Sequence, residues 1–330
     1  MTGFLLPLEM PSIEAALRDA RGGSEEARWV AAIALGHARG PGRQEAIEAL
    51  DHLLSDPFEE IRAQALEGIT EQVRAGAGIS NKQASSLFKD ISPAVRCVAV
   101  EAATVLLEKP VPALMPLLAD PDPSVRAAAA AELGELGAGV DTDKLAELLD
   151  DADSFVTMQA AAAMAALGDS RGEPLLLSLV DDNSDDALEA VVALSRLGSA
   201  KSVASLSRLA SRWFSPIELK TCAAAAMVSC GATEGLGILT GMLNARRQST
   251  RMATLTSLAR VPVQGIAHEV GRLLEGGRPM EVSAAIQTLG ALARVDLETV
   301  KLELERRRKS LDTELDGELK EMLASIDKNG

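Results

Sequence analysis

Apolar residues recur along this chain at the spacing of one helix face, and the same face returns after about thirty residues. In the run from Asp120 to Gly137, the residues Val125, Ala129 and Leu133 lie four positions apart, so they share one side of a helix. Aspartate, proline and serine precede this helix and a Gly-Ala-Gly sequence follows it. Such flanks favour a helix that begins and ends there.

The same pattern occurs nine times along the chain. We number each copy from its apolar residue as position 0; position 1 is arginine in the clearest copies, and position 4 is alanine in the first seven. A small residue in a fixed column lets neighbouring helices approach closely, as stacked hairpins require. The sequence therefore predicts an all-α, right-handed α-solenoid of about nine helical hairpins. The position 1 residues are Arg28, Arg62, Arg96, Arg126, Thr157, Ala187, Lys220, Arg251 and Ser283.

These columns resemble HEAT repeats, in particular the short bacterial type that also occurs in phycobilisome lyases. The resemblance covers residues 12–294 and implies a ladder of Asp and Arg side chains that links adjacent repeats. Thr157 and Ala187 stand where two further copies would have arginine, so the resemblance implies a broken ladder at Asp151 and Asp181. The implied ladder residues are Asp56, Arg62, Asp90, Arg96, Asp120 and Arg126.

The C-terminal segment differs in character from the repeats. We assign residues 1–294 to the solenoid, whereas residues 295–330 are highly charged with apolar residues at helical spacing. A stack of repeats exposes its last apolar face, so we predict that this segment is a helix or helix pair that caps the solenoid. The alternative is a short coiled-coil contact with a partner.

Residues that could carry catalysis are scarce. There are three histidines, and only His268-Glu269 resembles the repeated His-Glu pairs that hold iron in deoxyhypusine hydroxylase, a HEAT-repeat enzyme. The cysteines Cys97, Cys222 and Cys230 lack metal-binding spacing, and we expect buried, reduced thiols in a cytoplasmic protein. No stretch suits a signal peptide or a membrane span. We predict no catalytic, cofactor-binding or metal-binding residues and no membrane insertion.

The charge is unevenly distributed. The whole chain carries a net charge of −15; residues 1–200 hold 15 Lys/Arg and 33 Asp/Glu, whereas residues 201–294 hold 11 and 5. Nucleic acid bound along the array would be repelled by the acidic part, which makes it an unlikely partner. The basic part could hold an acidic flank of a protein partner, or it could be an ordinary solvated surface.

Each predicted hairpin has two helices, and the second one carries positions 0, 4 and 8 on its buried face. Apolar residues also occupy the opposite face of this second helix. In the middle repeats, positions 2 and 6 are mostly apolar, and Met158 and Leu188 are neighbours in the position 2 column. A helix that is apolar nearly all round is normally covered on every side, here either by tight superhelical curvature or by a partner. We predict partner contacts, with the arginine meeting the acidic flank, at Trp29, Met158, Leu188, Val192, Arg251 and Met252.

The predicted function is a non-enzymatic protein–protein interaction scaffold that binds a partner segment in its concave groove. The first alternative is an enzyme or enzyme subunit of the phycobilisome (bilin) lyase type, which the resemblance brings with it. The second alternative is nucleic-acid binding through residues 201–294. HEAT repeats occur in proteins of many unrelated roles, so the fold does not choose among these functions.

Overall fold

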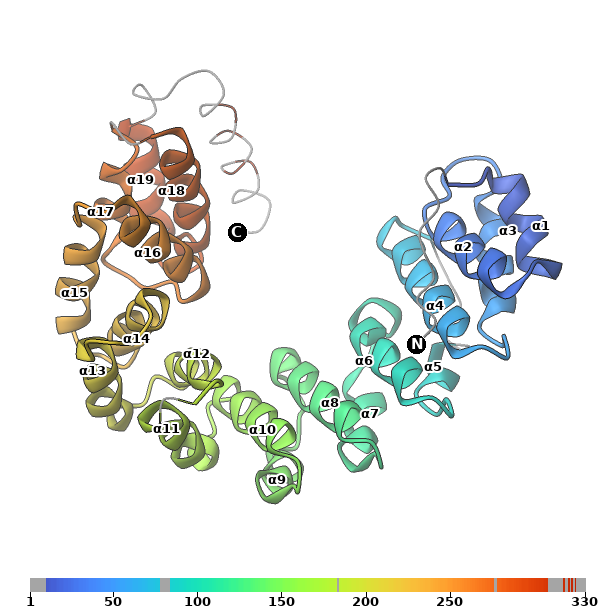
Figure 1. Cartoon of the computed structure of the whole chain (residues 1–330), viewed down its shortest axis with the longest axis horizontal. Coiled ribbons are helices and arrows are strands. Elements are labelled where there is room, and N and C mark those ends of the chain that lie inside the picture. The colour runs from blue at the N-terminus through green and yellow to red at the C-terminus, as the bar shows by residue number, and fades with distance from the viewer. Residues whose placement is uncertain are drawn as a thin grey trace. The chain divides into compact units, whose positions relative to one another are not determined.

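The computed structural model describes residues 10–77, 84–182, 184–275 and 278–307, together with residues 317, 320, 322 and 324. Within these residues all regular secondary structure is helical. The chain divides into two units, Met1–Ala163 and Met164–Gly330, and the division falls inside α10 (Ser154–Ala166). Each unit is a series of helical hairpins (Figure 1). The predicted all-α solenoid architecture is confirmed.

Each hairpin of the first unit consists of a first helix and a second helix, in chain order. The second helices of consecutive hairpins pack against each other from α2 to α8. The first helices are α1 (Ile13–Gly22), α3 (Arg43–Leu53), α5 (Ala84–Leu87), α7 (Val111–Leu114) with the 3₁₀ helix η1 (Met115–Ala119), and α9 (Thr142–Glu147) with η2 (Leu148–Asp150). The second helices are α2 (Glu25–Gly36), α4 (Glu59–Arg74), α6 (Pro93–Leu106), α8 (Pro123–Leu136) and α10.

The second unit repeats this order, so the described residues contain the nine predicted second helices. The first helices are η3 (Ser170–Gly172) with α11 (Glu173–Asp181), η4 (Ala200–Ser202) with α13 (Val203–Ser211), α15 (Glu234–Leu243) and α17 (Ala267–Arg272). The second helices are α12 (Ala187–Leu197), α14 (Ile217–Ser229), α16 (Gln248–Arg260) and α18 (Pro279–Leu292), and α19 (Leu297–Arg307) follows them.

Local sequence sets the helix ends. At the start of α8, the side chain of Asp122 accepts a hydrogen bond of 2.9 Å from the backbone N–H of Ser124, and Pro123 takes the first helical position, where no N–H donor is needed. At the end of α12, Gly198 adopts a left-handed conformation with φ of 65°, which a residue with a Cβ would disfavour. These caps limit the two second helices to 14 and 11 residues, about half of one repeat.

The predicted columns form the core. The position 4 alanines of the first seven repeats are all buried, and in the two remaining repeats the buried residues Thr254 and Ile286 take their place. At position 8, leucine, isoleucine and methionine side chains such as Leu35, Leu133 and Leu194 are also buried. Small and large side chains thus alternate between stacked helices, which fills the core without aromatic residues.

Two pairs of second helices in the first unit approach so closely that a glycine is required. A Cβ added to Gly36 would lie 2.7 Å from the Cα of Gly68, and a Cβ added to Gly134 would lie 2.7 Å from the Cα of Ala163. In both pairs the residue at position 9 of one helix faces the residue at position 7 of the next second helix. The repeat therefore places its tightest helix contact at the same position twice.

We expect Gly134→Ala to destabilise the protein by about 1–2 kcal/mol, because the methyl group would overlap the backbone of α10. This result would reverse the usual trend, since alanine in a helix interior is favoured over glycine by about 0.5–1 kcal/mol. Gly237→Ala is the matched control, because a Cβ there meets nothing within 4 Å. Thermal unfolding should show a lower melting temperature for the first variant only. An equal or higher melting temperature for Gly134→Ala would contradict this packing.

The helix α19 packs against α17 and α18 at the end of the second unit. Val300 and Leu304 are buried, and Nδ1 of His268 lies 3.0 Å from Oε1 of Glu303. These contacts agree with a capping segment after residue 294. The predicted apolar residues Leu311, Leu315 and Leu319 lie outside the described residues, so the cap over the full range 295–330 stays a prediction.

Candidate partner-binding surfaces

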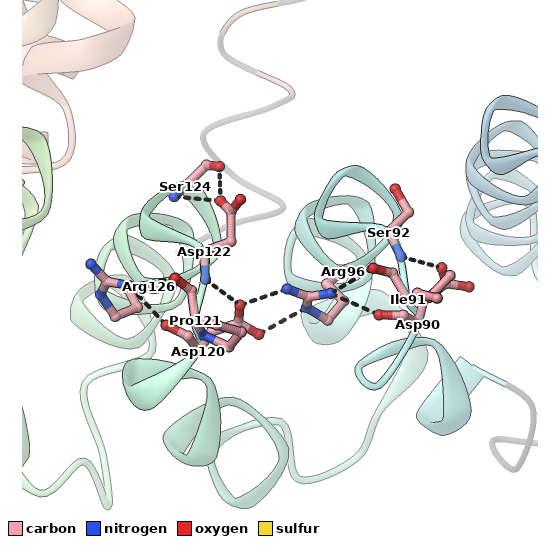
Figure 2. Close-up of polar contacts among 9 residues, drawn as sticks. All are labelled: Asp90, Ile91, Ser92, Arg96, Asp120, Pro121, Asp122, Ser124 and Arg126. Carbon is pink, nitrogen blue, oxygen red and sulfur yellow. Dashed lines mark hydrogen bonds and ion pairs between the residues drawn. The ribbon is translucent and has the colours of Figure 1, made fainter.

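Aspartate and arginine side chains link successive hairpins of the first unit. In Arg96, Nε donates to Oδ2 of Asp120 at 2.8 Å and Nη2 donates to Oδ1 at 2.6 Å, so the guanidinium holds the carboxylate by two parallel bonds. Nη1 of Arg96 also donates to the backbone carbonyl of Asp90, six residues earlier, at 2.7 Å. Each arginine therefore fixes the turn of its own hairpin and the turn of the next one (Figure 2).

The ladder contains all six implied residues and two more. Arg62 pairs with Asp90, and Arg126 pairs with Asp151, so the implied break at Asp151 was wrong, because its partner comes from the preceding repeat. Arg28 pairs with Asp56 in the same way at 2.7 Å. Each pair joins one repeat to the next, so an arginine at position 1 indicates an ion pair with the aspartate in the turn of the following repeat. Asp181 instead pairs with Arg208 of α13 at 2.9 Å.

Two of the ladder carboxylates, those of Asp90 and Asp151, are held in their ionised form. Burial alone would favour protonation of Asp90, but hydrogen bonds from Arg62 and from the N–H of Ser92 outweigh it and hold its pKa below the usual value. Hydrogen bonds from Arg126 and from the N–H of Asp153 lower the pKa of Asp151. A carboxylate with a lowered pKa stabilises the fold above about pH 4, and this contribution is lost as the pH falls further.

Two of the six predicted partner-binding residues are committed to the fold. The side chain of Met158 on α10 is only 2% exposed, so it belongs to the core and offers no groove contact. Arg251 on α16 pairs with Glu281 on α18, with a distance of 3.0 Å between Nη2 and Oε2, and Nη1 donates to the carbonyl of Ala245. Arg251 therefore acts as a ladder residue of the second unit, and the prediction that it binds an acidic flank is corrected.

The other four predicted residues are half-buried and remain a prediction. They lie on three second helices, with Trp29 on α2 in the first unit, Leu188 and Val192 on α12, and Met252 on α16 in the second. Sequence reasoning assigned position 2 to the uncovered face. The structure buries position 2 in α8, α10 and α14, where Ala127, Met158 and Thr221 stand.

A pocket of about 350 Å³ opens on the second helices α2, α4 and α6 of the first unit, and we call it the α4 pocket. Position 6 of each helix lines it, where Ile33, Glu67 and Glu101 stand, so this column is accessible at the pocket. Gly36 and Gly68 lie beside them, where α2 and α4 approach each other most closely. The remaining lining residues are His37, Gln64, Thr70, Glu71, Arg74, Val98 and Ala102.

Carboxylates outnumber cationic side chains in the α4 pocket, where Glu67, Glu71 and Glu101 are accompanied by Arg74. Glu67 and Glu101 are exposed, whereas Glu71 forms an ion pair of 2.9 Å with Arg39. On the neighbouring helix α8, burial and the negative charges of Glu135 and Glu101 raise the pKa of Glu132. A carboxylate whose neighbours oppose its ionisation indicates excess negative charge, which a cationic group would relieve.

Aromatic side chains are concentrated on the surface, although the chain has few of them. Among the six aromatic residues in the described part of the chain, only Phe88 is buried. Phe58 and Phe155 are exposed in the first unit, and the adjacent residues Trp213 and Phe214 are 84% and 91% exposed in the second. Exposed aromatic residues are enriched at protein interfaces, so this distribution favours contact surfaces.

The remaining candidate chemistry is structural. Burial raises the pKa of Cys230 to about 11 and raises the pKa of Cys222, so both thiols stay protonated at neutral pH and are poor nucleophiles. Among the described residues, no group of three His, Cys, Asp or Glu side chains could hold a metal ion. No helix within the same residues is long and apolar enough to cross a membrane.

The hairpins and their ladder define an α-solenoid of short two-helix repeats. Residues 82–165 match the family model described as HEAT repeats, and this stretch includes three ladder aspartates. Residues 82–165 are therefore HEAT repeats. No curated protein matches the chain in sequence.

The solved structures that are similar in fold include two that share a large part of this chain. The YibA protein of E. coli is 22% identical, with a TM-score of 0.54, and the match covers 65% of this chain and 82% of that one. The complex of CpcE and CpcF of phycocyanin lyase from Nostoc sp. is 18% identical, with a TM-score of 0.52, covering 72% and 96%. At these identities the similarity concerns the fold alone.

Proposed function

We propose that this HEAT-repeat protein is a non-enzymatic scaffold that binds a protein partner in the α4 pocket. The observation that carries this proposal is the pocket itself, a hollow with apolar residues and a carboxylate rim on the uncovered face of three second helices. A cavity of this size takes a side chain or two of a partner segment, and the packed helices around it hold the pocket in shape.

The charge of the pocket selects the chemistry of the partner. Glu67 and Glu101 favour a basic side chain, and the small apolar surface of Ile33, Val98 and Ala102 favours a short aliphatic neighbour. This replaces the acidic flank expected from sequence, because Arg251 is engaged by Glu281. A segment with adjacent basic and aliphatic residues fits both features.

Charge reversal at the rim should weaken this binding. In the pocket variant, Glu67→Lys/Glu101→Lys, two attractions become repulsions, and we expect partner affinity to fall about tenfold or more. Affinity capture from the organism that encodes the chain, read by quantitative mass spectrometry, identifies the partner, and titration of the purified partner measures the loss. The control, Glu48→Lys/Asp150→Lys, changes the net charge equally at two exposed residues outside the pocket.

Three outcomes would contradict the proposal. The pocket variant could capture the same proteins as the parent chain, or the control could lose them equally, which would indicate a general charge effect. A visible absorbance band on mixing with an open-chain tetrapyrrole, together with chromophore transfer, would instead favour a function related to the phycocyanin lyase whose fold is similar.

A further inference from the structure

The second unit presents apolar and cationic side chains together along one series of turns. The turn between α13 and α14 carries Trp213 and Phe214, which are almost fully exposed. The next two turns between first and second helices carry Arg246, Arg247 and Arg278, which are exposed, and Met280 at the start of α18 is 76% exposed. We call these six residues the aromatic edge.

Contacts between the repeats place these turns side by side. Arg251 donates to the carbonyls of Ala245 and Arg246 in one turn and pairs with Glu281 beside Met280 in the next. At the other end, Thr221 in the first turns of α14 donates to the sulfur of Met242, near the end of α15, at 3.4 Å. Nζ of Lys220 donates to the carbonyl of Trp213 at 3.2 Å. The three turns therefore belong to consecutive repeats that contact one another.

The guanidinium groups of this edge are accessible to a binding partner. Among the described residues, neither Arg246 nor Arg247 forms an ion pair, and Arg278 donates to the amide oxygen of Gln248 at 3.0 Å. The nearby carboxylate of Glu281 is taken by Arg251. Exposed aromatic and arginine side chains are the residues that contribute most to binding energy at protein interfaces.

We infer that the aromatic edge of one chain docks into the α4 pocket of a second copy of the chain, an inference that rests on the pocket of the proposed function. The edge supplies apolar side chains and guanidinium groups, and the pocket supplies carboxylates and the small apolar surface of Ile33, Val98 and Ala102. Arg246 and Arg247 meet Glu67 and Glu101, and the aromatic pair meets Ile33 and Val98. Both sets of complementary groups are present in the same molecule.

The net charge of the chain favours a second copy over a membrane or a nucleic acid as the partner of the aromatic edge. The net charge of −15 opposes the approach of the chain to an anionic bilayer or a nucleic-acid duplex. The pocket of a second copy is a small acidic surface that the edge can meet alone, because salt screens more distant charges beyond about 10 Å. The same charge contrast orients two copies as they approach.

The contact joins two different surfaces, and this determines the size of the assembly that it can form. The edge and the pocket are different surfaces, so each bound copy still offers one free pocket and one free edge. The association therefore continues head to tail and forms rings or open chains. We expect the mean mass in solution to rise with concentration and to fall as the salt concentration increases.

Two variants and their mixture test this contact by light scattering after size exclusion and by sedimentation velocity. In the edge variant, Trp213→Ser/Phe214→Ser, the association constant should fall about 30-fold, as expected for the loss of two anchoring aromatic residues. The pocket variant should also remain monomeric where the parent chain associates. Leu302→Ser is the control, because it removes another exposed apolar side chain of the second unit and should associate like the parent.

Mixing the edge variant and the pocket variant gives the sharpest test. One has an intact pocket and the other has an intact edge, so the mixture should form pairs of two chains and nothing larger. A chain that combines Glu67→Lys/Glu101→Lys with Arg246→Glu/Arg247→Glu should recover self-association, because both partners of the contact are reversed. Circular dichroism should show the parent helical content for every variant, since all the changed residues are exposed.

Several results would overturn the inference. They are a parent chain that stays monomeric at all concentrations, a mixture that forms no pairs, or an edge that binds vesicles of anionic phospholipid without any self-association. Partner capture shows separately whether the proposed function fails. If self-association is absent but the pocket variant alone loses the captured partner, the pocket binds a partner that is not a second copy; if neither depends on the pocket, both proposals fall.

Discussion

Replacing Arg96 with alanine is expected to lower the free energy of unfolding by about 3 kcal/mol, because the change leaves a buried carboxylate without its cation. Arg96 and Asp120 are both buried, and two hydrogen bonds join them. The carbonyl of Asp90 would lose its donor as well. Urea unfolding followed by far-UV circular dichroism measures the loss.

Two further variants separate the cost of an unpaired charge from the value of the pair. Arg39→Ala breaks the exposed ion pair with Glu71 and should cost less than about 1 kcal/mol. Arg96→Met/Asp120→Leu removes both charges at once and should cost much less than Arg96→Ala alone. If Arg96→Ala costs no more than Arg39→Ala, the ladder contributes little to stability.

Replacing Met158 with glutamate is expected to unfold the middle of the chain rather than to affect binding alone. The side chain is 2% exposed, and burying an unpaired carboxylate in its place should destabilise the protein by about 4 kcal/mol or more. The matched control is Phe155→Glu on the same helix, because Phe155 is 54% exposed and should tolerate the change.

The measurement is the melting temperature, read together with hydrogen exchange across α10. We expect the melting temperature of Met158→Glu to fall sharply and the amides of α10 to exchange faster, whereas Phe155→Glu should resemble the parent chain. A stable Met158→Glu variant that has lost only partner capture would restore Met158 to a binding surface.

The sequence was sufficient for the repeat architecture because the same physical constraint returns in every copy. A stacked hairpin needs a small residue at position 4 and a larger one at position 8, and the structure buries both columns. The ladder residues were also evident. Their pairing was not, because a distance of six residues along the chain does not reveal that the carboxylate of Asp120 binds Arg96 of the preceding repeat.

The surfaces were harder to predict than the core. Helical periodicity assigned positions 2 and 6 to one face opposite the buried columns, but neighbouring helices bury Met158 at position 2 and leave Glu67 at position 6 exposed. An exposed glutamate on a helix is unremarkable by itself. The α4 pocket depends on glycines and carboxylates from three separate repeats, and the aromatic edge depends on three separate turns, so neither appears in any single stretch of sequence.

The ladder also makes the length of the first unit adjustable in steps of one repeat. Each turn supplies one carboxylate to the arginine before it and one carbonyl to the arginine after it, as Asp90 does for Arg62 and Arg96. If residues 91–120 were excised, Asp90 would lie six residues before Arg126 and would still face Arg62. A shorter solenoid would retain every kind of contact between its repeats, whereas a deletion of a few residues would break both the ladder and the helix register. Whole repeats can therefore be gained or lost in evolution without a new fold.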